Sequence, residues 1–208
     1  MSEAVAGVLL AGGLSRRMGG GDKCLRSLGG MTVLDRIVTR VRPQVSHLVL
    51  NANGDPSRFA SVGLSVIADS VEGFAGPLAG VLTGLEWTAR THPDCRWLAS
   101  FPTDAPFLPR DLVRKMLRAV EASGADMACA RSDGRTHPVI GLWPVRLADT
   151  LRRAMVEEDL RKVDLWTDRF RLEHVDFPID PIDPFFNTNR PEDLDEAETL
   201  LAKGLAGD

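Results

Sequence analysis

Short apolar runs and helically spaced apolar residues alternate along the first two thirds of this chain. The apolar runs at 4–11, 47–52, 64–68 and 96–101 predict buried strands. Between them, apolar residues at helical spacing predict helices that begin after Thr32, after Pro77 and at Pro109. Strands that alternate with helices favour an α/β fold, in which helices cover both faces of a mostly parallel sheet.

The last third of the chain is less regular. Its pattern predicts a strand at 139–142, a helix at 145–158, a strand at 172–177 and a terminal helix that begins near Pro191 and ends at Gly204. No linker or low-complexity tract interrupts the 208 residues, so the sequence predicts a single domain, 1–208.

Composition and charge narrow the class of protein. A formal net charge of −4 gives no reason to expect nucleic acid as a partner. Charged residues interrupt every apolar run before the roughly 18–20 residues of a membrane span, and the start of the chain lacks the pattern of a signal peptide. The odd number of cysteines, 3, suits reduced thiols. We therefore expect a cytoplasmic protein that contacts neither nucleic acid nor membrane.

The segment from Leu10 to Lys23 directly follows the first predicted strand. It combines five glycines with Arg16, Arg17 and Lys23. Glycines let backbone N–H groups approach an anion, and cations neutralise it. The alternative is a surface turn with solvated charges, but the position after a buried strand favours a phosphate-binding loop.

Polar residues follow several of the other predicted strands. Asn51, Asp69 and Asp104 lie where strands end, at the edge of such sheets where ligands collect. Asp104 is the best candidate to bind Mg²⁺, which takes few protein oxygens besides phosphates and water. The alternative for Asp104 is an Asx turn or a helix cap before Pro106.

Three further features have both a functional and a structural interpretation. The turn from Gly76 to Gly80 begins a helix whose N-terminus could face an anion, or Gly80 allows close packing. Asn187 and Asn189 could bind a phosphate, a metal-bound water or a polar heterocycle, although helix capping would explain Asn189. A histidine placed like His137, before a proline and a strand, is more often structural than catalytic.

Together, these segments resemble the molybdenum cofactor guanylyltransferases over nearly the whole chain. The similarity lies in Leu10-Ala-Gly-Gly…Asp-Lys23, Gly76-Pro-Leu-Ala-Gly80, Asp104 and Asn187-Thr-Asn189. The resemblance implies a Rossmann-like sheet of the nucleotide-diphospho-sugar transferase type. It divides the domain into a nucleotide-binding portion at about 4–130 and an acceptor-side portion at about 131–208.

What the resemblance implies is transfer of GMP from GTP to molybdopterin that carries molybdenum, with release of pyrophosphate. By this resemblance, GTP is bound by Leu10, Ala11, Gly12, Lys23, Asn51 and Asp69, together with Asp104 as the Mg²⁺ ligand. Arg17, Gly80, Asn187 and Asn189 match positions on the pterin side, and Arg17, Lys23 and Asp104 would serve catalysis. Arg161 and Lys162 are the nearest match to a basic pair in a later helix of the family.

The expected chemistry agrees with the residues present. A phosphate monoester is already ionised near neutral pH, because its second pKa is about 6, and it needs no general base. Transfer between two anions instead needs cations that position and neutralise them.

Two other functions stay open from the sequence. One is a cytidylyltransferase that acts on the same pterin, and the other is a non-catalytic module that binds GTP or the molybdenum cofactor. The resemblance also implies transient contact with cofactor-synthesis proteins or apo-molybdoenzymes.

Overall fold

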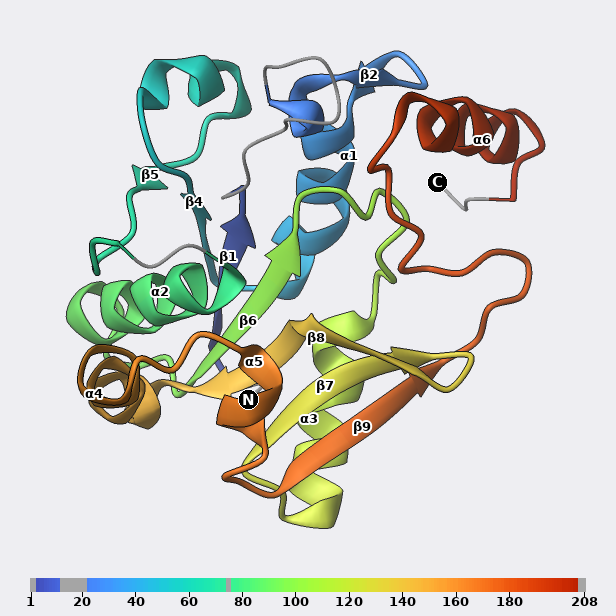
Figure 1. Cartoon of the computed structure of the whole chain (residues 1–208). Coiled ribbons are helices and arrows are strands. Elements are labelled where there is room, and N and C mark those ends of the chain that lie inside the picture. Colours follow the sequence, from blue (N-terminus) through green and yellow to red (C-terminus); the bar gives the residue numbers. More distant parts are fainter. Residues whose placement is uncertain (1–2, 12–21, 74–75, 206–208) are drawn as a thin grey trace.

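The computed structural model describes residues 3–11, 22–73 and 76–205. Its centre is a sheet of seven strands in the order β5-β4-β1-β6-β8-β7-β9 (Figure 1). The strands are β1 (Val5–Leu10), β4 (His47–Asn51), β5 (Val66–Ile67), β6 (Trp97–Pro102), β7 (Met127–Ser132), β8 (Arg135–Pro144) and β9 (Leu172–Phe177). Among the described strands of this sheet, β8 alone runs against its neighbours. The mostly parallel α/β fold is therefore confirmed.

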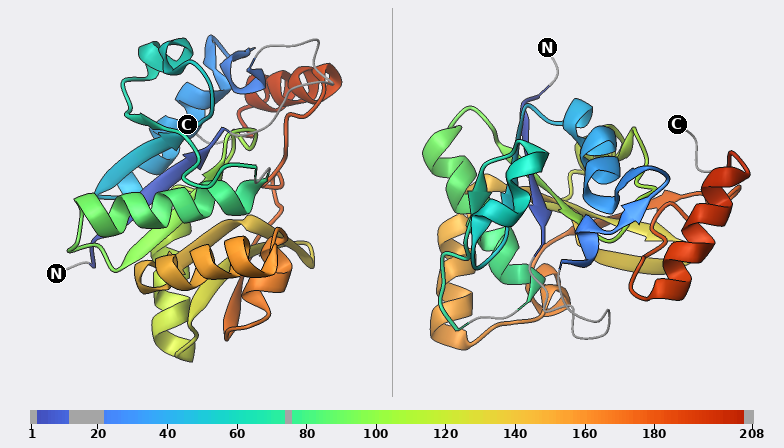
Figure 2. Two further views of the ribbon diagram at one scale, coloured as in Figure 1. Left: turned by 60° about the vertical axis from the view of Figure 1, so that its left-hand side comes forward. Right: turned by 90° about the horizontal axis from the view of Figure 1, so that it is seen from above.

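The α-helices of the described residues lie in two layers, one on each face of the sheet (Figure 2). The first layer contains α1 (Val33–Val41), α3 (Leu112–Ser123) and α6 (Pro191–Ala202), and the second contains α2 (Pro77–Thr91), α4 (Ala148–Glu158) and α5 (Val163–Thr167). Successive side chains of β1 point to opposite faces of the sheet. Val5 and Leu9 pack with the first layer, and Ala6 and Val8 pack with the second.

Helix ends follow the signals in the sequence. The side chain of Thr32 accepts a hydrogen bond from the backbone N–H of Asp35 and so caps α1, as expected. Gly124 ends α3 with a φ of 66°, a left-handed conformation that glycine adopts without steric cost. Helix α6 begins with Pro191 and an acidic first turn, which also agrees with the prediction.

Several boundaries differ from the prediction. Helix α3 begins at Leu112 rather than at Pro109, because residues 109–112 form a separate turn in which the N–H of Leu112 donates to the carbonyl of Pro109. The predicted helix at 145–158 divides into a 3₁₀ turn and α4, which begins at Ala148. Strand β8 is longer than predicted and begins at Arg135.

The prediction contains no counterpart of β7, of α5 or of a small hairpin. Strand β7 consists largely of small and polar residues, which lack the branched side chains typical of strands. Helix α5 has only 5 residues, too few for a helical period. The small hairpin of β2 (Ser27–Leu28) and β3 (Met31–Thr32) follows Lys23 and packs near α6, since the N–H of Gly29 donates to Glu198. Within the described residues, no helix is long and apolar enough to cross a membrane.

Candidate active site

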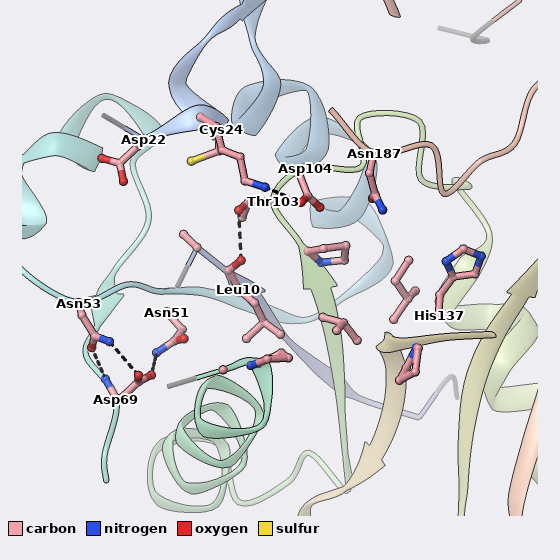
Figure 3. Close-up of a pocket in the computed structure, with 18 of the residues that line it drawn as sticks. Leu10, Asp22, Cys24, Asn51, Asn53, Asp69, Thr103, Asp104, His137 and Asn187 are labelled. Atoms are coloured by element: carbon pink, nitrogen blue, oxygen red, sulfur yellow. Dashed lines mark hydrogen bonds and ion pairs between the residues drawn. The ribbon is translucent and has the colours of Figure 1, made fainter. Parts of the chain in front are cut away.

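A cavity of about 990 Å³ opens at the carboxyl ends of β1, β4 and β6. This is the edge at which parallel sheets bind ligands. Figure 3 shows three groups of side chains around it: Asn51, Asn53 and Asp69 on one side, Thr103 and Asp104 at the centre, and Asn187 and His137 on the far side. The cavity volume is at the upper end of the range for small-molecule sites, so there is room for more than one substrate.

Lys23 and Asp104 meet at the centre of the cavity. Lys23 Nζ lies 2.9 Å from Asp104 Oδ2 and donates to Asn189 Oδ1 at 2.6 Å. Both members of the ion pair are partly exposed, at 26% and 21% of their side-chain surface, so a ligand can reach them. The carboxylate of Asp104 therefore pairs with the ammonium of Lys23, whereas its role as a metal ligand stays a prediction. Asn189 uses its side chain on Lys23, and the residue that caps α6 is Arg190.

The backbone of Asp104 also fixes the segment that carries the two asparagines. Its carbonyl accepts hydrogen bonds from the N–H and the hydroxyl of Thr188, at 2.8 and 3.1 Å. The Asp193 carboxylate binds the backbone N–H groups of Asn189 and Arg190 from the far side. As a result, the chain before α6 lies against the end of β6, and Asn187 lines the cavity.

A second polar group lies at the ends of β4 and β5. One oxygen of the Asp69 carboxylate accepts from Asn51 Nδ2 at 2.9 Å and the other from Asn53 Nδ2 at 2.8 Å. The Asn53 side chain also accepts from the N–H of Asp69, so the two residues hold each other in place. The Asp69 carboxylate is thereby oriented before any ligand arrives.

Arg58 links this group to the residue that precedes Lys23. Its guanidinium donates to the carbonyl of Asn53 at 2.6 Å and to Asp22 Oδ1 at 3.1 Å. All three residues line the cavity. Arg58 therefore joins Asp22 to the turn that carries Asn53.

The N-terminus of α2 closes another side of the cavity, where Gly76 and Pro77 line it. Gly76 has a φ of 132°, which an L side chain rarely adopts. Gly80, one turn further along α2, lies behind the lining, where an added Cβ would collide with Asn51 Oδ1 and approach Leu10 Cδ2 to 2.6 Å. The structure thus gives Gly80 a packing contact with Asn51.

Cys24 also lines the cavity, but its thiol is a poor nucleophile. Burial, together with the nearby Asp22 carboxylate, raises the pKa of Cys24 to about 11. The reactive form of cysteine is the thiolate, which is scarce at neutral pH with such a pKa. Covalent chemistry at this position is therefore disfavoured.

The remaining predicted residues are distributed as follows. Leu10 and Ala11 line the cavity next to Asn51, whose carbonyl accepts from the N–H of Ala11. Gly12 and Arg17 lie outside the described residues. Arg161 and Lys162 precede α5 instead of lying in a helix, and Arg161 bonds Asp159 and the carbonyl of Gly73, which lines the cavity.

Sequence reasoning missed Asn53, Arg58 and the start of β8, including His137, as cavity residues. Asn53 comes two residues after a predicted strand end, and this position was the only available signal for it. Arg58 lies in a polar turn and carries no recognisable motif.

Asp104 and Asn189 carry oxygen atoms of the kind that bind a magnesium ion. The ammonium of Lys23 contacts one carboxylate oxygen and one amide oxygen, the hard ligands that Mg²⁺ accepts. Among the described residues, no group of three or more His, Cys, Asp or Glu side chains could form a closed metal site. A single carboxylate suffices where phosphates and water supply the other ligands.

Comparison with known proteins gives consistent matches. The family described as MobA-like NTP transferase domain matches residues 7–170. The chain is 57% identical to the molybdenum cofactor guanylyltransferase of Bradyrhizobium sp. (strain ORS 278), over 96% of this chain and 94% of the relative. It is 54% identical to the molybdenum cofactor guanylyltransferase of Nitrobacter hamburgensis, over 94% of each chain.

A solved structure shares the fold. The crystal structure of molybdopterin-guanine dinucleotide biosynthesis protein A from Archaeoglobus fulgidus superimposes with a TM-score of 0.73. The match covers 95% of this chain and 99% of that one, at 22% sequence identity.

Proposed function

Because this chain belongs to the family of MobA-like NTP transferase domains, we propose that it transfers GMP from GTP to the phosphate of molybdenum-bearing molybdopterin. The products are the guanine dinucleotide form of the cofactor and pyrophosphate. The observation that carries the proposal is the ion pair of Lys23 and Asp104 in one large cavity, with Asn189 bonded to the same ammonium group. These residues come from three distant parts of the chain, so the arrangement is a property of the fold.

The reaction joins two anions. An oxygen of the acceptor phosphate forms a bond to the α-phosphorus of GTP, and the bond from that phosphorus to the bridging oxygen of pyrophosphate breaks. The leaving pyrophosphate takes the electron pair, and the acceptor phosphate needs no deprotonation because it is already ionised. The site must therefore supply positive charge and alignment rather than a base.

Lys23 would supply positive charge directly, and Asp104 would do so through the metal ion that it holds. Without ligand, each neutralises the other across 2.9 Å. Mg²⁺ held by Asp104, phosphate oxygens and water would stabilise the charge that develops on the transferring and leaving groups. With Asp104 as a metal ligand, the Lys23 ammonium would be available to bind phosphate oxygens. Asn51, Asn53 and Asp69 are already oriented by hydrogen bonds to one another, and they offer further hydrogen bonds to the nucleoside end of GTP.

The test is turnover with molybdopterin, GTP and Mg²⁺, measured as dinucleotide product and pyrophosphate. We expect both products with GTP, and much less with CTP. Turnover with CTP but not with GTP would identify the protein as the cytidylyltransferase. Absence of pyrophosphate under all conditions, with GTP bound, would identify a non-catalytic binding module.

Asp104→Asn tests the metal role in the same assay. We expect a loss of at least about a hundredfold in turnover with little change in melting temperature, because the Lys23–Asp104 pair is partly exposed and contributes little to stability. The matched control is Asp176→Asn, which removes an exposed carboxylate that pairs with Arg131 at 2.6 Å outside the cavity. Near-normal turnover of Asp104→Asn with Mg²⁺ would overturn the role.

A further inference from the structure

The far wall of the cavity is built by an irregular part of β8. Strand β8 pairs with β6 only over Gly141–Pro144, so its earlier residues extend beyond the end of that ladder. In the ladder with β7, Gly141 of β8 pairs with Cys129, and the next pair along β7 is Ala130 with His137. Three residues of β8, 138–140, therefore have no partner on β7 and bulge into the lining of the cavity.

Buried side chains hold this bulge in place. The Ser100 hydroxyl donates to the carbonyl of Val139 at 2.6 Å and accepts from Trp143 Nε1 at 2.7 Å. Ser100 and Trp143 are almost fully buried, at 1% and 2% exposure. The wall is thus a fixed part of the core rather than a loose loop.

His137 lies at the start of the bulge and faces the cavity from the side of Asn187 (Figure 3). One ring nitrogen, Nε2, lies 2.8 Å from the hydroxyl of Ser132 across the β7–β8 hairpin. The ring also packs on Phe185, with 4.6 Å between the centroids. These two contacts fix the plane of the imidazole.

The second ring nitrogen is free for a ligand. Nδ1 of His137 has no hydrogen-bond partner among residues 3–11, 22–73 and 76–205. Burial lowers the pKa of His137, and Arg135 acts in the same direction while Asp183 opposes it. A neutral imidazole offers one donor and one acceptor, so a ring anchored through Nε2 can still form one directed hydrogen bond through Nδ1.

The two sides of the cavity differ in chemistry. Asp22, Asp69 and Arg58 give the nucleotide side charged groups, whereas the wall from 135 to 140 combines one arginine with polar and apolar side chains. A flat heterocycle that carries a phosphate suits such a wall, because apolar atoms cover its faces and a few polar atoms read its edge.

We propose that His137 is an acceptor-binding residue, whose Nδ1 forms a hydrogen bond with the heterocyclic acceptor beside Asn187. This inference rests on the proposed function and extends it to a residue whose position before a proline and a strand suggested a structural role. Ser132 is then a positioning residue, because it contacts His137 and does not line the cavity.

Three substitutions separate the two ring nitrogens. His137→Phe keeps an aromatic ring on Phe185 and removes both nitrogens. His137→Asn keeps a polar atom near the position of Nδ1, and His137→Gln keeps one near the position of Nε2. The measurement is the affinity for molybdopterin in a direct binding titration without nucleotide, together with KM for each substrate and the melting temperature.

For His137→Phe and His137→Gln, we expect the acceptor to bind about tenfold more weakly, the loss of one hydrogen bond to a ligand. His137→Asn should retain most of the affinity, and all three should bind GTP as the parent protein does. Ser132→Ala should affect the acceptor less than His137→Phe.

The inference is overturned if His137→Gln binds the acceptor normally while His137→Asn fails, because the bond to Ser132 would then be what matters. It is also overturned if His137→Phe lowers the melting temperature and leaves acceptor affinity unchanged. The titration needs no turnover, so these results stand apart from the proposed function, which fails instead when the unaltered protein binds both substrates and releases no pyrophosphate.

Discussion

At the scale of single residues, the site depends on one ammonium group. Lys23 Nζ contacts Asp104 from the end of β6 and Asn189 from the segment before α6. Removal of this cation takes the contact away from both oxygens and, under the proposed function, takes a positive charge away from the phosphates of the nucleotide. Lys23 should therefore control binding of the nucleotide as well as its transfer.

Lys23→Met should raise the Kd for GTP by at least about tenfold, because a charged hydrogen bond to a phosphate is lost. The dependence of that Kd on salt should also become weaker, since one ionic contact is removed. The measurement is a GTP titration at several salt concentrations. Lys115→Met is the control, because Lys115 pairs with Asp111 on α3. Equal GTP affinity in the two variants would contradict the prediction.

Gly80 and Gly84 lie one turn apart on α2, so their alanine variants can be compared directly. A Cβ at either position would collide with its surroundings, but at Gly80 the neighbours are Asn51 and Leu10, whereas at Gly84 they are Leu98 and Val8 in the core. Both alanine variants should lose about 1–3 kcal/mol of stability through overpacking. Only Gly80→Ala should also weaken GTP binding, because Asn51 must move.

Urea unfolding and GTP titration of both variants check this prediction. The matched loss of stability in Gly84→Ala shows how much a collision alone costs. If Gly84→Ala weakens GTP binding as much as Gly80→Ala, the contact between Gly80 and Asn51 has no specific role.

At the scale of elements, α2 is held against α4 by the ion pair of Glu86 and Arg152. The guanidinium binds both carboxylate oxygens, with 2.8 Å between Nη2 and Oε2, and also approaches the carbonyl of Ser70. Ser70 follows Asp69 directly. The pair therefore joins two helices and the turn that carries a cavity residue.

This ion pair should make stability depend on pH. Burial alone would raise the pKa of Glu86, but hydrogen bonds from Arg152 and Ser70 outweigh it and hold that pKa below its ordinary value of 4.5. The stabilisation is therefore fully present above pH 4.5 and is lost as the pH falls through the lower pKa of the folded state.

Glu86→Gln should be less stable than the unaltered protein at pH 7, and the difference should shrink below about pH 4.5. Urea unfolding at both pH values measures it. Glu158→Gln, which removes an exposed partner of Arg169, controls for general effects of charge. A difference that stays constant with pH would exclude the ion pair as its cause.

At the scale of the whole molecule, β6 and β8 join the predicted nucleotide-binding and acceptor-side portions. Their antiparallel ladder lies in the middle of the sheet and runs from the pair of Trp97 and Pro144 to the pair of Ser100 and Gly141. Both hydrophobic layers contain residues from the two portions. The predicted division near residue 130 therefore does not interrupt the packing.

We therefore expect one cooperative unfolding transition for the whole chain. Tryptophan fluorescence reports on β6, β8 and α5 through Trp97, Trp143 and Trp166, and far-UV circular dichroism reports on all helices. The two signals should coincide during urea unfolding. Two separate transitions would show that the portions are independent domains and would contradict the prediction of a single domain.

The sequence predicts most of the cavity residues that lie at strand ends. Leu10, Ala11, Asn51, Asp69 and Asp104 line the cavity as expected, since parallel strands bring their carboxyl ends to one edge. Asn53, Arg58 and His137 could not be identified in this way. Their positions depend on a polar turn and on the register of β8 against β7, which local patterns do not specify.

The sequence by itself determined the fold class, the resemblance to a guanylyltransferase family and the residue types available for phosphate chemistry. These follow from short-range periodicity and from motifs, both of which are local. Only the tertiary structure decided that Lys23 meets Asp104 across 81 residues and Asn189 across 166, that Gly80 packs against Asn51, and that His137 faces the cavity. Such contacts depend on how the core packs and how the strands align, and both are properties of the whole chain.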